Sequence, residues 1–191
     1  MIVVSAPSGC GKGTVLNEIL KDKNFYYSVS ATTRAPREGE ADGVNYHFIT
    51  KAEFEKLIAE NGMLEYAKYC DNYYGTPKEI LEKKMNEGID VILEIEVQGA
   101  MQVKRLCPEA VFIFIAPPSI AELERGTESD EIIAKRVSEA AGEIRQAVNY
   151  DYVIVNAALE DAVEDFKTIV KAEKLKTAYA ENLINEVLEN A

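Results

Sequence analysis

The stretch Ile2-Val3-Val4-Ser5-Ala6-Pro7-Ser8-Gly9-Cys10-Gly11-Lys12-Gly13-Thr14 joins a short apolar run to a glycine-rich turn and then to a lysine that opens a helical pattern. Successive backbone N–H groups of such a turn point at one spot, and the N-terminus of the following helix adds a partial positive charge. Lys12 supplies a mobile full charge. We therefore predict a cradle for the phosphates of a nucleoside triphosphate, formed by Ala6, Pro7, Ser8, Gly9, Cys10, Gly11, Lys12, Gly13 and Thr14.

Two positions depart from the strict P-loop pattern G-x-x-x-x-G-K-[ST], because Ala6 replaces the first glycine and Gly13 replaces the hydroxyl residue. Alanine is acceptable at a position with negative φ. Gly13 offers no hydroxyl to Mg²⁺, so we expect Thr14 or a water molecule to take that ligand position. The alternative interpretation is an ordinary strand-turn-helix connection with incidental glycines.

The composition indicates one globular unit. The chain has 191 residues, of which 47% are hydrophobic and 28% charged, enough for one core and a small inserted lobe. No apolar run approaches the roughly 20 residues that span a bilayer, and Met1 leads directly into the first strand, so we expect a cytoplasmic protein without membrane contact. The net charge of −12 argues against general nucleic-acid binding. Cys10, Cys70 and Cys107 lack the spacing of a disulfide framework or a zinc site.

Apolar, β-branched runs alternate with helical patterns along most of the chain, which predicts an α/β fold, a three-layer P-loop domain with a parallel sheet. We expect strands over 2–5, near 26–30, and over 91–95, 111–116 and 152–156, and helices over 12–21, 77–86, 97–106, 128–148 and 159–182.

Between residues 32 and 76 the pattern changes to short alternating segments with one helix near 51–60, which predicts an inserted, mostly-β lobe. A second interruption follows Ala116-Pro117-Pro118 and indicates a lid. The expected division is a core of 1–31, 77–118 and 141–191, a lobe of 32–76 and a lid of 119–140. The sequence does not indicate an oligomeric state.

Arg34 and Arg37 lie three positions apart across a proline-stiffened segment. Two guanidinium groups at this spacing can grip one phosphate with forked hydrogen bonds. The pair predicts a phosphate site in the inserted lobe. The alternatives are a solvated basic patch and ion pairs with Glu38 and Glu40.

Glu65 lies in an expected strand of the same lobe, and Tyr46, Tyr73, Tyr74 and Thr76 lie in neighbouring segments. A single carboxylate can accept both the N1–H and the 2-amino group of guanine, whereas adenine presents an acceptor at N1. Such a site rejects the wrong base because its buried carboxylate would be left unpaired. The alternative is that the tyrosines are half-buried strand residues and Glu65 is solvated.

The apolar run Val91-Ile92-Leu93-Glu94-Ile95-Glu96 ends in two carboxylates at alternate positions, which point the same way at the carboxyl end of a strand. One of them can hold Mg²⁺ directly or through water, and the other can orient a substrate. The metal ligands expected from the residues are Thr14 and Glu94. The alternative is a pair of solvent-exposed charges.

Arg125, Arg136 and Arg145 lie in or after the expected lid, and we expect the first two to fold over the transferring phosphoryl group. Phosphoryl transfer depends mainly on alignment and charge stabilisation rather than on a nucleophilic relay. The expected catalytic residues are therefore Lys12, Arg34, Arg37, Arg125 and Arg136.

Over roughly residues 1–175 the chain resembles guanylate kinases, and between Ser119 and Arg125 it is shorter than the family pattern. The matching stretches are 5–14, 28–40, 43–46, 72–76, 94–99, 114–119, 125–128 and 153–156. The resemblance implies transfer of the γ-phosphoryl group of ATP to GMP with Mg²⁺. It implies that Lys12 holds the triphosphate, that Arg125 and Arg136 are lid arginines, and that Asn156 lies near the adenine. The residues that it implies around GMP are Ser30, Arg34, Arg37, Tyr46, Glu65, Tyr74, Thr76, Glu94 and Glu96.

Two other functions remain open at this point. Guanylate-kinase-like domains also serve as non-catalytic protein-binding modules, but those have lost phosphate-binding residues, whereas Lys12, Arg34 and Arg37 are present here. The chain could also be a kinase for another small phosphorylated acceptor. The two kinases are distinguished by whether Glu65 and Thr76 select guanine.

Overall fold

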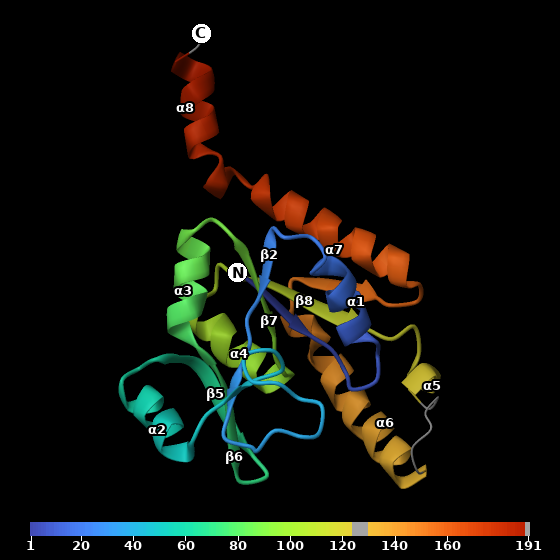
Figure 1. Ribbon diagram of the computed structural model, residues 1–191. Helices are drawn as coiled ribbons and strands as arrows, with labels where there is room; N and C mark the ends of the chain where they lie inside the picture. Colours follow the sequence, from blue (N-terminus) through green and yellow to red (C-terminus); the bar gives the residue numbers. More distant parts are fainter. Residues whose placement is uncertain (124–129, 190–191) are drawn as a thin grey trace.

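A parallel sheet with a central β1 organises the chain (Figure 1). The computed structural model describes residues 1–123 and 130–189, with side chains of 130–136 and 181–183 left out. Within this part, the larger sheet has the order β2-β7-β1-β8-β9, and β1 pairs in parallel with both β7 and β8. Its strands are β2 (Phe25–Tyr27), β7 (Asp90–Glu94), β1 (Ile2–Ser5), β8 (Val111–Ala116) and β9 (Tyr152–Val155).

Helices cover both faces of this sheet, because alternate residues of each buried strand point to opposite faces. Ile2 and Val4 pack in a cluster with α1 (Lys12–Ile19) and α7 (Leu159–Lys174). Val3 packs on the other face, where α3 (Lys78–Asn86) and α4 (Val97–Leu106) contribute side chains. The three-layer α/β architecture expected from the sequence is therefore confirmed.

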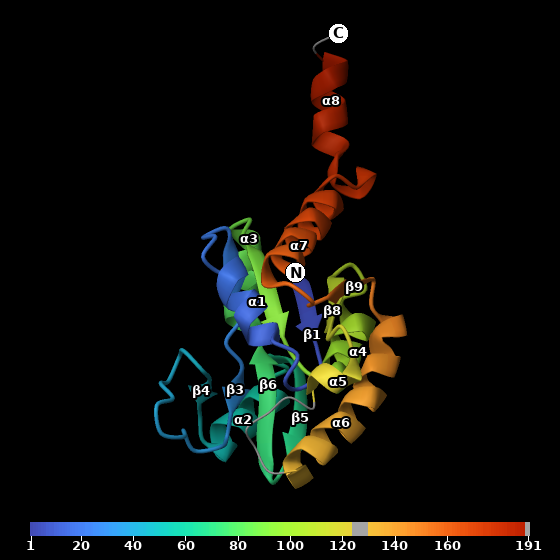
Figure 2. The same ribbon diagram turned by 90° about the vertical axis from the view of Figure 1, so that its right-hand side faces the viewer.

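A second, smaller sheet forms the inserted region, in the order β4-β3-β6-β5, seen below the larger sheet in Figure 2. A small apolar cluster around the fully buried Phe54 holds this sheet against its helix, and the Phe54 ring stacks on Tyr73 with centroids 5.1 Å apart. The elements are β3 (Ala31–Thr32), β4 (His47–Phe48), α2 (Lys51–Ala59), β5 (Met63–Tyr69) and β6 (Asn72–Pro77).

The strands β3 and β6 are not among the ranges expected from the sequence, although Tyr73 and Tyr74 of β6 are half-buried strand residues, as the alternative interpretation has them. β6 reads as turn sequence because it contains asparagine, glycine and proline, yet it pairs along its length with β5. The two strands are joined at Cys70 and Asp71, whose φ values of 46° and 65° match the turn type that suits a tight hairpin. In β6, a Cβ on Gly75 would lie 2.6 Å from the carbonyl oxygen of Glu65, so close pairing requires glycine there.

The helix expected over residues 159–182 is wrong beyond α7. The chain leaves the helical path at Lys176, forms a 3₁₀ turn, η2 (Thr177–Tyr179), and then forms α8 (Glu181–Glu189), which points away from the body in Figures 1 and 2. The buried positions of α7 end at Glu173, whereas Leu175 is 73% exposed. The apolar periodicity of the sequence continues beyond Glu173, the last residue of α7 that is buried against the core. The periodicity alone therefore does not show where α7 ends.

Smaller differences concern element ends. The strand expected near 26–30 is β2, Phe25–Tyr27, and the helix expected over 128–148 is α6 (Asp130–Arg145) followed by the 3₁₀ turn η1 (Gln146–Asn149). A short helix, α5 (Ile120–Leu123), precedes α6. Among the described residues, no helix is both long and apolar enough to cross a membrane.

Candidate active site

The loop between β1 and α1 has the backbone of a phosphate cradle. Gly9 and Gly11 have φ values of 84° and 81°, a region that side chains rarely adopt. A Cβ on Gly11 would also lie 2.6 Å from Nδ2 of Asn156, which donates a hydrogen bond of 2.8 Å to the carbonyl oxygen of Cys10. Gly11 is the N-cap of α1 and no side chain caps it. The loop therefore presents the N-terminus of α1 with its free N–H groups to an anion.

The remaining loop positions fit the same interpretation. Ala6 is not among the residues with positive φ, as its side chain requires. Cys10 is buried, and its thiol lies 3.8 Å from the carbonyl oxygen of Ile115, so the cysteine packs inward. Ser8, Gly13 and Thr14 are exposed, and the backbone of Ser8 forms a hydrogen bond with the carboxylate of Glu143 on α6.

Lys12 is held by a carboxylate at the neighbouring strand end. Its Nζ lies 2.9 Å from Oε1 of Glu94, the last residue of β7, and the two side chains are 19% and 25% exposed. The other oxygen of Glu94 accepts a hydrogen bond of 3.0 Å from the hydroxyl of Tyr27. The carboxyl edge of the sheet thus brings together the P-loop lysine and the first of the two predicted strand-end carboxylates.

Glu65 is buried at the other end of the same region, with 6% of its surface exposed. Its Oε1 accepts a hydrogen bond of 2.8 Å from the Thr76 hydroxyl across the β5–β6 pair. Its Oε2 faces α4, where a Cβ on Gly99 would lie 2.9 Å away. Burial raises the pKa of the Glu65 carboxyl above its ordinary value, and the Thr76 hydrogen bonds offset only part of that effect.

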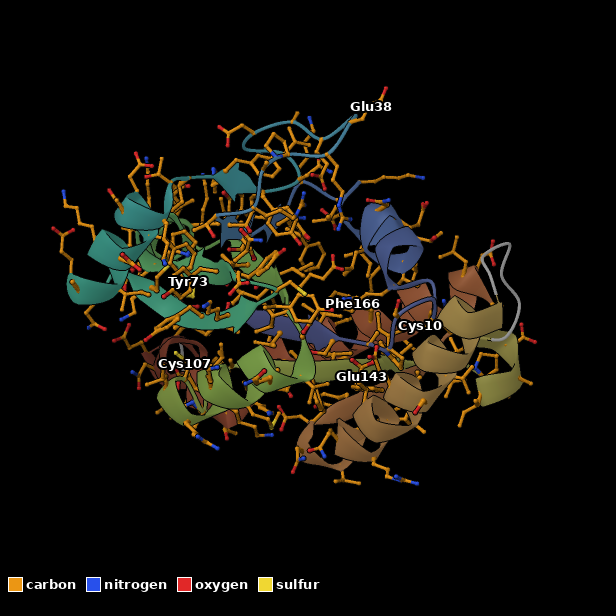
Figure 3. All side chains as sticks on the ribbon, turned by 90° about the horizontal axis from the view of Figure 1, so that it is seen from below. Cys10, Glu38, Tyr73, Cys107, Glu143 and Phe166 are labelled. Carbon is orange, nitrogen blue, oxygen red and sulfur yellow. The ribbon has the colours of Figure 1, made fainter. Side chains whose placement is uncertain are left out.

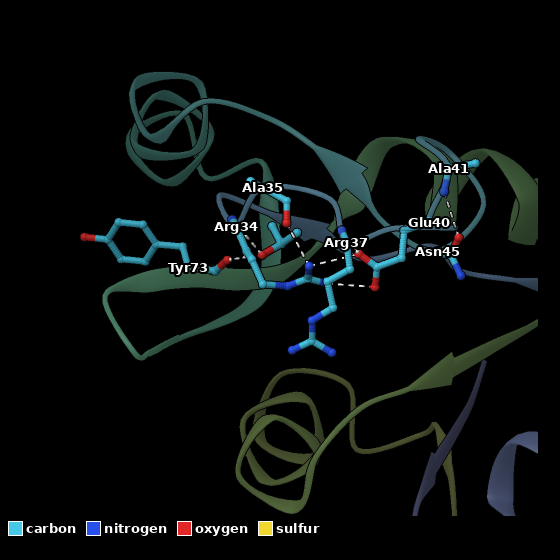
Figure 4. A network of polar contacts seen from close by, with 8 residues as sticks. Arg34, Ala35, Arg37, Glu40, Ala41, Asn45 and Tyr73 are labelled. Carbon is cyan, nitrogen blue, oxygen red and sulfur yellow. Dashed lines mark hydrogen bonds and ion pairs between the residues drawn. The ribbon is translucent and has the colours of Figure 1, made fainter.

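Arg34 forms an ion pair with Glu40 in this structure (Figure 4). This pairing is one of the alternatives given in the sequence analysis. Its two terminal nitrogens each donate a hydrogen bond of 2.9 Å to Glu40, one to each carboxylate oxygen. Glu40 also accepts a hydrogen bond of 2.7 Å from the backbone N–H of Arg37. The hydrogen bonds from Arg34 and from that N–H lower the pKa of Glu40 to about 2. The guanidinium lies 5.5 Å from the ring centre of Tyr46.

Arg37 differs from Arg34, since no dashed line reaches its guanidinium in Figure 4 and its side chain is exposed. Within the described residues, the Arg37 guanidinium therefore has no hydrogen bond or ion pair to exchange before it meets a ligand.

One cavity of about 330 Å³ joins these groups. It lies between the small sheet and the carboxyl end of β7, and eight of the nine residues predicted around GMP line it: Ser30, Arg34, Arg37, Tyr46, Glu65, Tyr74, Glu94 and Glu96. The ninth, Thr76, is buried behind Glu65 and contacts it directly.

The cavity also contains residues that the sequence pattern did not single out. The sequence offers Glu40 only as an alternative partner of the arginines, and it does not single out Tyr69 or Gln98 as site residues. Tyr27 contacts the site through Glu94. A pattern search finds charged residues at motif spacing, but it does not find side chains that reach the site from the opposite strand or helix.

A larger, more open hollow of about 920 Å³ adjoins this cavity and shares Tyr69, Glu96 and Gln98 with it. It lies between α4 and α6, and Figure 3 shows Glu143 of α6 close to Cys10 of the P-loop. Burial and the neighbouring Glu96 raise the pKa of Glu143.

The structure does not place the side chains of the two arginines expected in a lid. Arg125 lies outside the described residues, and for Arg136 only the helical backbone on α6 is described. Among the described residues, no group of three or more His, Cys, Asp or Glu side chains gathers in a way that could hold a metal ion.

Known proteins with similar sequences share one description. The protein-family model "Guanylate kinase" matches residues 1–173. A guanylate kinase of Latilactobacillus sakei is 52% identical over 183 residues, covering 92% of this chain and 90% of that protein. One from Listeria monocytogenes is 49% identical over 196 residues, covering 99% of this chain and 96% of that protein. Since that alignment is longer than the 191 residues here, it includes positions at which this chain has no residue.

A solved structure agrees with the sequence comparisons. The crystal structure of guanylate kinase from Anaplasma phagocytophilum superposes with a TM-score of 0.81 at 37% identity, covering 100% of this chain and 93% of that one. The resemblance noted in the sequence therefore holds along the whole chain and in three dimensions. The chain belongs to the guanylate kinase family.

Proposed function

We propose that ATP binds at the P-loop and that GMP binds in the 330 Å³ cavity, with its base toward Glu65 and its phosphate toward Arg34 and Arg37. The enzyme transfers the γ-phosphoryl group of ATP to GMP, giving ADP and GDP. The observation that carries the site assignment is that a single cavity joins the buried carboxylate of Glu65 to Arg34 and Arg37. Glu94, which pairs with Lys12 of the P-loop, lines the same cavity.

The base end supports guanine as the acceptor base. Glu65 is a buried carboxylate whose described hydrogen-bond donors are the hydroxyl and the backbone of Thr76, so it has acceptor capacity left. Guanine N1–H and its 2-amino group are adjacent donors that match two carboxylate lone pairs. Adenine would place its N1 acceptor against the same oxygens, and the resulting unpaired carboxylate costs about 1–3 kcal/mol or more.

The phosphate end supports a monophosphate group. The Arg37 guanidinium is available at once, while Arg34 must exchange Glu40 for the phosphate or share its donors between them. Tyr46, Tyr74 and Ser30 line the same end and add hydroxyl donors. Each pair of like charges brought to 4 Å costs about 4 kcal/mol at an effective dielectric constant of 20, so the cations here serve to offset that repulsion.

The residues near the P-loop fit a bound Mg²⁺. Thr14 and Glu94 offer hard oxygen ligands, Thr14 is an exposed residue, and Mg²⁺ commonly takes one or two protein oxygens together with substrate phosphates. We propose that these two residues hold the ion, directly or through water. When bound, Mg²⁺ would neutralise charge on the phosphate oxygens. Lys12 would leave Glu94 for the triphosphate, which frees Oε1 of that carboxylate.

The arrangement of the remaining parts is also a proposal. Residues 32–76 would act as the GMP-binding lobe and 119–140 as a lid that brings Arg125 and Arg136 over the transferring group. Asn156, which contacts the P-loop at Cys10, would lie near the adenine. Closure would exclude water and so limit wasteful hydrolysis of ATP. The cytoplasm, where ATP and GMP are available, stays the predicted compartment.

The test is a coupled assay of ADP release with ATP and each of GMP, AMP, CMP and UMP, on the parent and on Lys12→Ala. We expect turnover with GMP only, and a loss of about 1,000-fold in kcat for Lys12→Ala because a full charge at the phosphates is removed. A folded parent without GMP-dependent turnover would defeat the proposal. A preference for AMP would refute the role given to Glu65.

A further inference from the structure

The hydroxyl of Tyr27 holds one oxygen of a carboxylate at the centre of the site. It donates a hydrogen bond of 3.0 Å to Oε2 of Glu94, while Oε1 of the same carboxylate lies 2.9 Å from Nζ of Lys12. Each oxygen of Glu94 thus has a different partner. Tyr27 does not line the cavity that contains Arg34, Glu65 and Glu94; it reaches the site by its hydrogen bond to Glu94, with Tyr46 nearby.

The strand pairing explains how Tyr27 reaches this position. β2 and β7 are parallel neighbours, and Tyr27 pairs with Ile92, two residues before Glu94 on the same strand. Tyr27 and Ile92 pack in the apolar cluster on the face of the sheet that carries α1, so both partners of Glu94 come from that face. The preceding residue, Tyr26, packs in the cluster on the opposite face, where its ring lies 5.6 Å from Nζ of Lys84.

The two partners of Glu94 differ in how firmly they are held. Lys12 has a flexible four-carbon side chain on the P-loop, where the triphosphate would compete for its charge. Tyr27 has a rigid ring that is half-buried in the apolar cluster, with only the hydroxyl directed at the carboxylate. Binding of ATP would therefore remove the bond at Oε1 and leave the bond at Oε2 in place.

We propose that Tyr27 is a positioning residue for Glu94: it fixes Oε2, so that Oε1 is the oxygen that exchanges Lys12 for a ligand when the site fills. This inference rests on the proposed function, in which Glu94 faces the reacting phosphates or their Mg²⁺. Without the Tyr27 hydroxyl, the Glu94 carboxylate would rotate about its terminal bond, which is a soft torsion. A misplaced group at a reacting centre lowers kcat.

The protonation state of Tyr27 agrees with this role. Burial, followed by the nearby charge of Glu94 and the hydrogen bond to it, raises the pKa of the Tyr27 hydroxyl. Glu94 and Tyr46 are the titratable groups that face it. These effects favour the neutral hydroxyl, which is the donor to Oε2 of Glu94 in this structure.

The experiment compares Tyr27→Phe with Tyr26→Phe, since each removes one hydroxyl from adjacent residues of the same strand. We expect Tyr27→Phe to lower kcat about 10-fold, the effect of one hydrogen bond to a charged group, with the KM for ATP changed by less than about two-fold. Tyr26→Phe should retain the parent kcat. Thermal unfolding of both variants would show whether either substitution disturbs the fold.

A double-mutant cycle with Glu94→Ala separates positioning from a general structural effect. If Tyr27 acts through Glu94, then Tyr27→Phe has no further effect on kcat once Glu94 is alanine. A further 10-fold loss in that background would overturn the inference, as would equal kcat values for Tyr27→Phe and Tyr26→Phe.

The same cycle distinguishes failure of the inference from failure of the proposed function. A Glu94→Ala variant with the parent kcat would mean that Glu94 has no role in the reaction, whatever Tyr27 does. An inactive Glu94→Ala variant beside a fully active Tyr27→Phe variant would leave the proposed function standing and remove only the role of Tyr27.

Discussion

The P-loop and the 330 Å³ cavity beside it, called the acceptor cavity below, are the two proposed phosphate sites, and they are built in different ways. The P-loop is shaped by backbone: two glycines with positive φ, a buried strand before them and a helix after them. The acceptor cavity is shaped by residues of β5, β6, β7 and α4, and by residues of the loops next to β3, β4 and β7. The residues that shape the P-loop are therefore consecutive in the sequence. The residues that shape the acceptor cavity come from several separate elements.

The two regions therefore tolerate substitution differently. A backbone cradle fails when one φ value cannot be reached, whereas a side-chain cavity loses one contact at a time. Ion pairs that a ligand can exchange, such as Lys12 with Glu94 and Arg34 with Glu40, occupy both regions in the ligand-free protein. They partly neutralise the charged groups, and in the proposed function the substrates replace them.

The largest effect that we predict from this comparison is that of Gly11→Ala in the backbone cradle. Alanine would be strained at φ 81°, at about 1–2 kcal/mol, and its Cβ would displace Asn156 from its hydrogen bond to Cys10, at about 1 kcal/mol. Because the P-loop N–H groups would move with it, we expect kcat to fall by about 100-fold. Coupled ADP-release assays and urea unfolding measure the two effects.

Gly13→Ala is the matched control, one residue inside α1. A Cβ there meets nothing within 4 Å, and Gly13 is not among the positive-φ glycines. Removing a glycine from a helix stabilises by about 0.5–1 kcal/mol. We expect Gly13→Ala to raise the unfolding free energy and to leave kcat within about three-fold of the parent. Equal losses in both variants would contradict the view that backbone conformation shapes this loop.

The same contrast explains which parts could be predicted from the sequence. The parallel sheet and its helices follow from continuous apolar runs, and the expected ranges for β1, β8 and α4 agree with the structure at both ends. The hairpin strand β6 and the break after α7 could not be found this way, since their causes are pairing with β5 and the end of the buried surface.

For the site, the sequence identified side chains but not their ligand-free partners. Glu65, Arg34 and Arg37 stand out by residue type and spacing, and all three line one cavity. The carboxylate on Arg34 was one of several alternatives, and the Lys12–Glu94–Tyr27 contacts were not foreseen. These contacts join elements far apart in the chain, so only the folded backbone specifies them.

At the base end of the side-chain cavity, we predict that Glu65→Gln raises the KM for GMP about 30-fold and leaves the KM for ATP nearly unchanged. The glutamine amide keeps the acceptor for Thr76 but turns a donor toward the guanine donors, which costs about 2 kcal/mol. Titration calorimetry with GMP and with ATP separates the two affinities. Equal losses for both nucleotides would show that Glu65 does not face the base.

At the phosphate end, we predict that Arg37→Ala weakens GMP binding more than Arg34→Ala does, by about 30-fold against about 10-fold. The Arg37 guanidinium gains its phosphate bonds without losing an internal partner, whereas Arg34 exchanges a bidentate pair with Glu40. The melting temperature should fall only for Arg34→Ala, because that variant leaves Glu40 without its guanidinium. A reversed order of affinities would mean that Arg34 keeps Glu40 and still binds the phosphate in full.

The smallest effect that we predict is on the pH dependence of stability, and it isolates the buried carboxylate of the base end. Burial raises the pKa of Glu65 in the folded protein above its ordinary value of 4.5, so the folded state holds this proton more tightly than the unfolded state. The associated stability is fully present below about pH 4.5 and is lost as the pH rises through the folded pKa. Glu65→Gln cannot titrate, so it should match the parent near pH 4 and exceed it in unfolding free energy at pH 7.

Glu53→Gln in the same lobe provides a control of opposite sign. Glu53 forms a capping box with Thr50 at the start of α2, and those hydrogen bonds lower its pKa. The stabilisation of the folded protein by ionised Glu53 is present above the ordinary pKa of a glutamate and is lost as the pH falls. Glu53→Gln should therefore lower the unfolding free energy at pH 7. Urea unfolding of the parent and both variants between pH 4 and pH 8 measures the difference. A lower unfolding free energy of Glu65→Gln than of the parent at pH 7, as expected for Glu53→Gln, would contradict this prediction. The Glu65 carboxylate would then be fully paired in the absence of GMP, and it would have no acceptor capacity left for guanine.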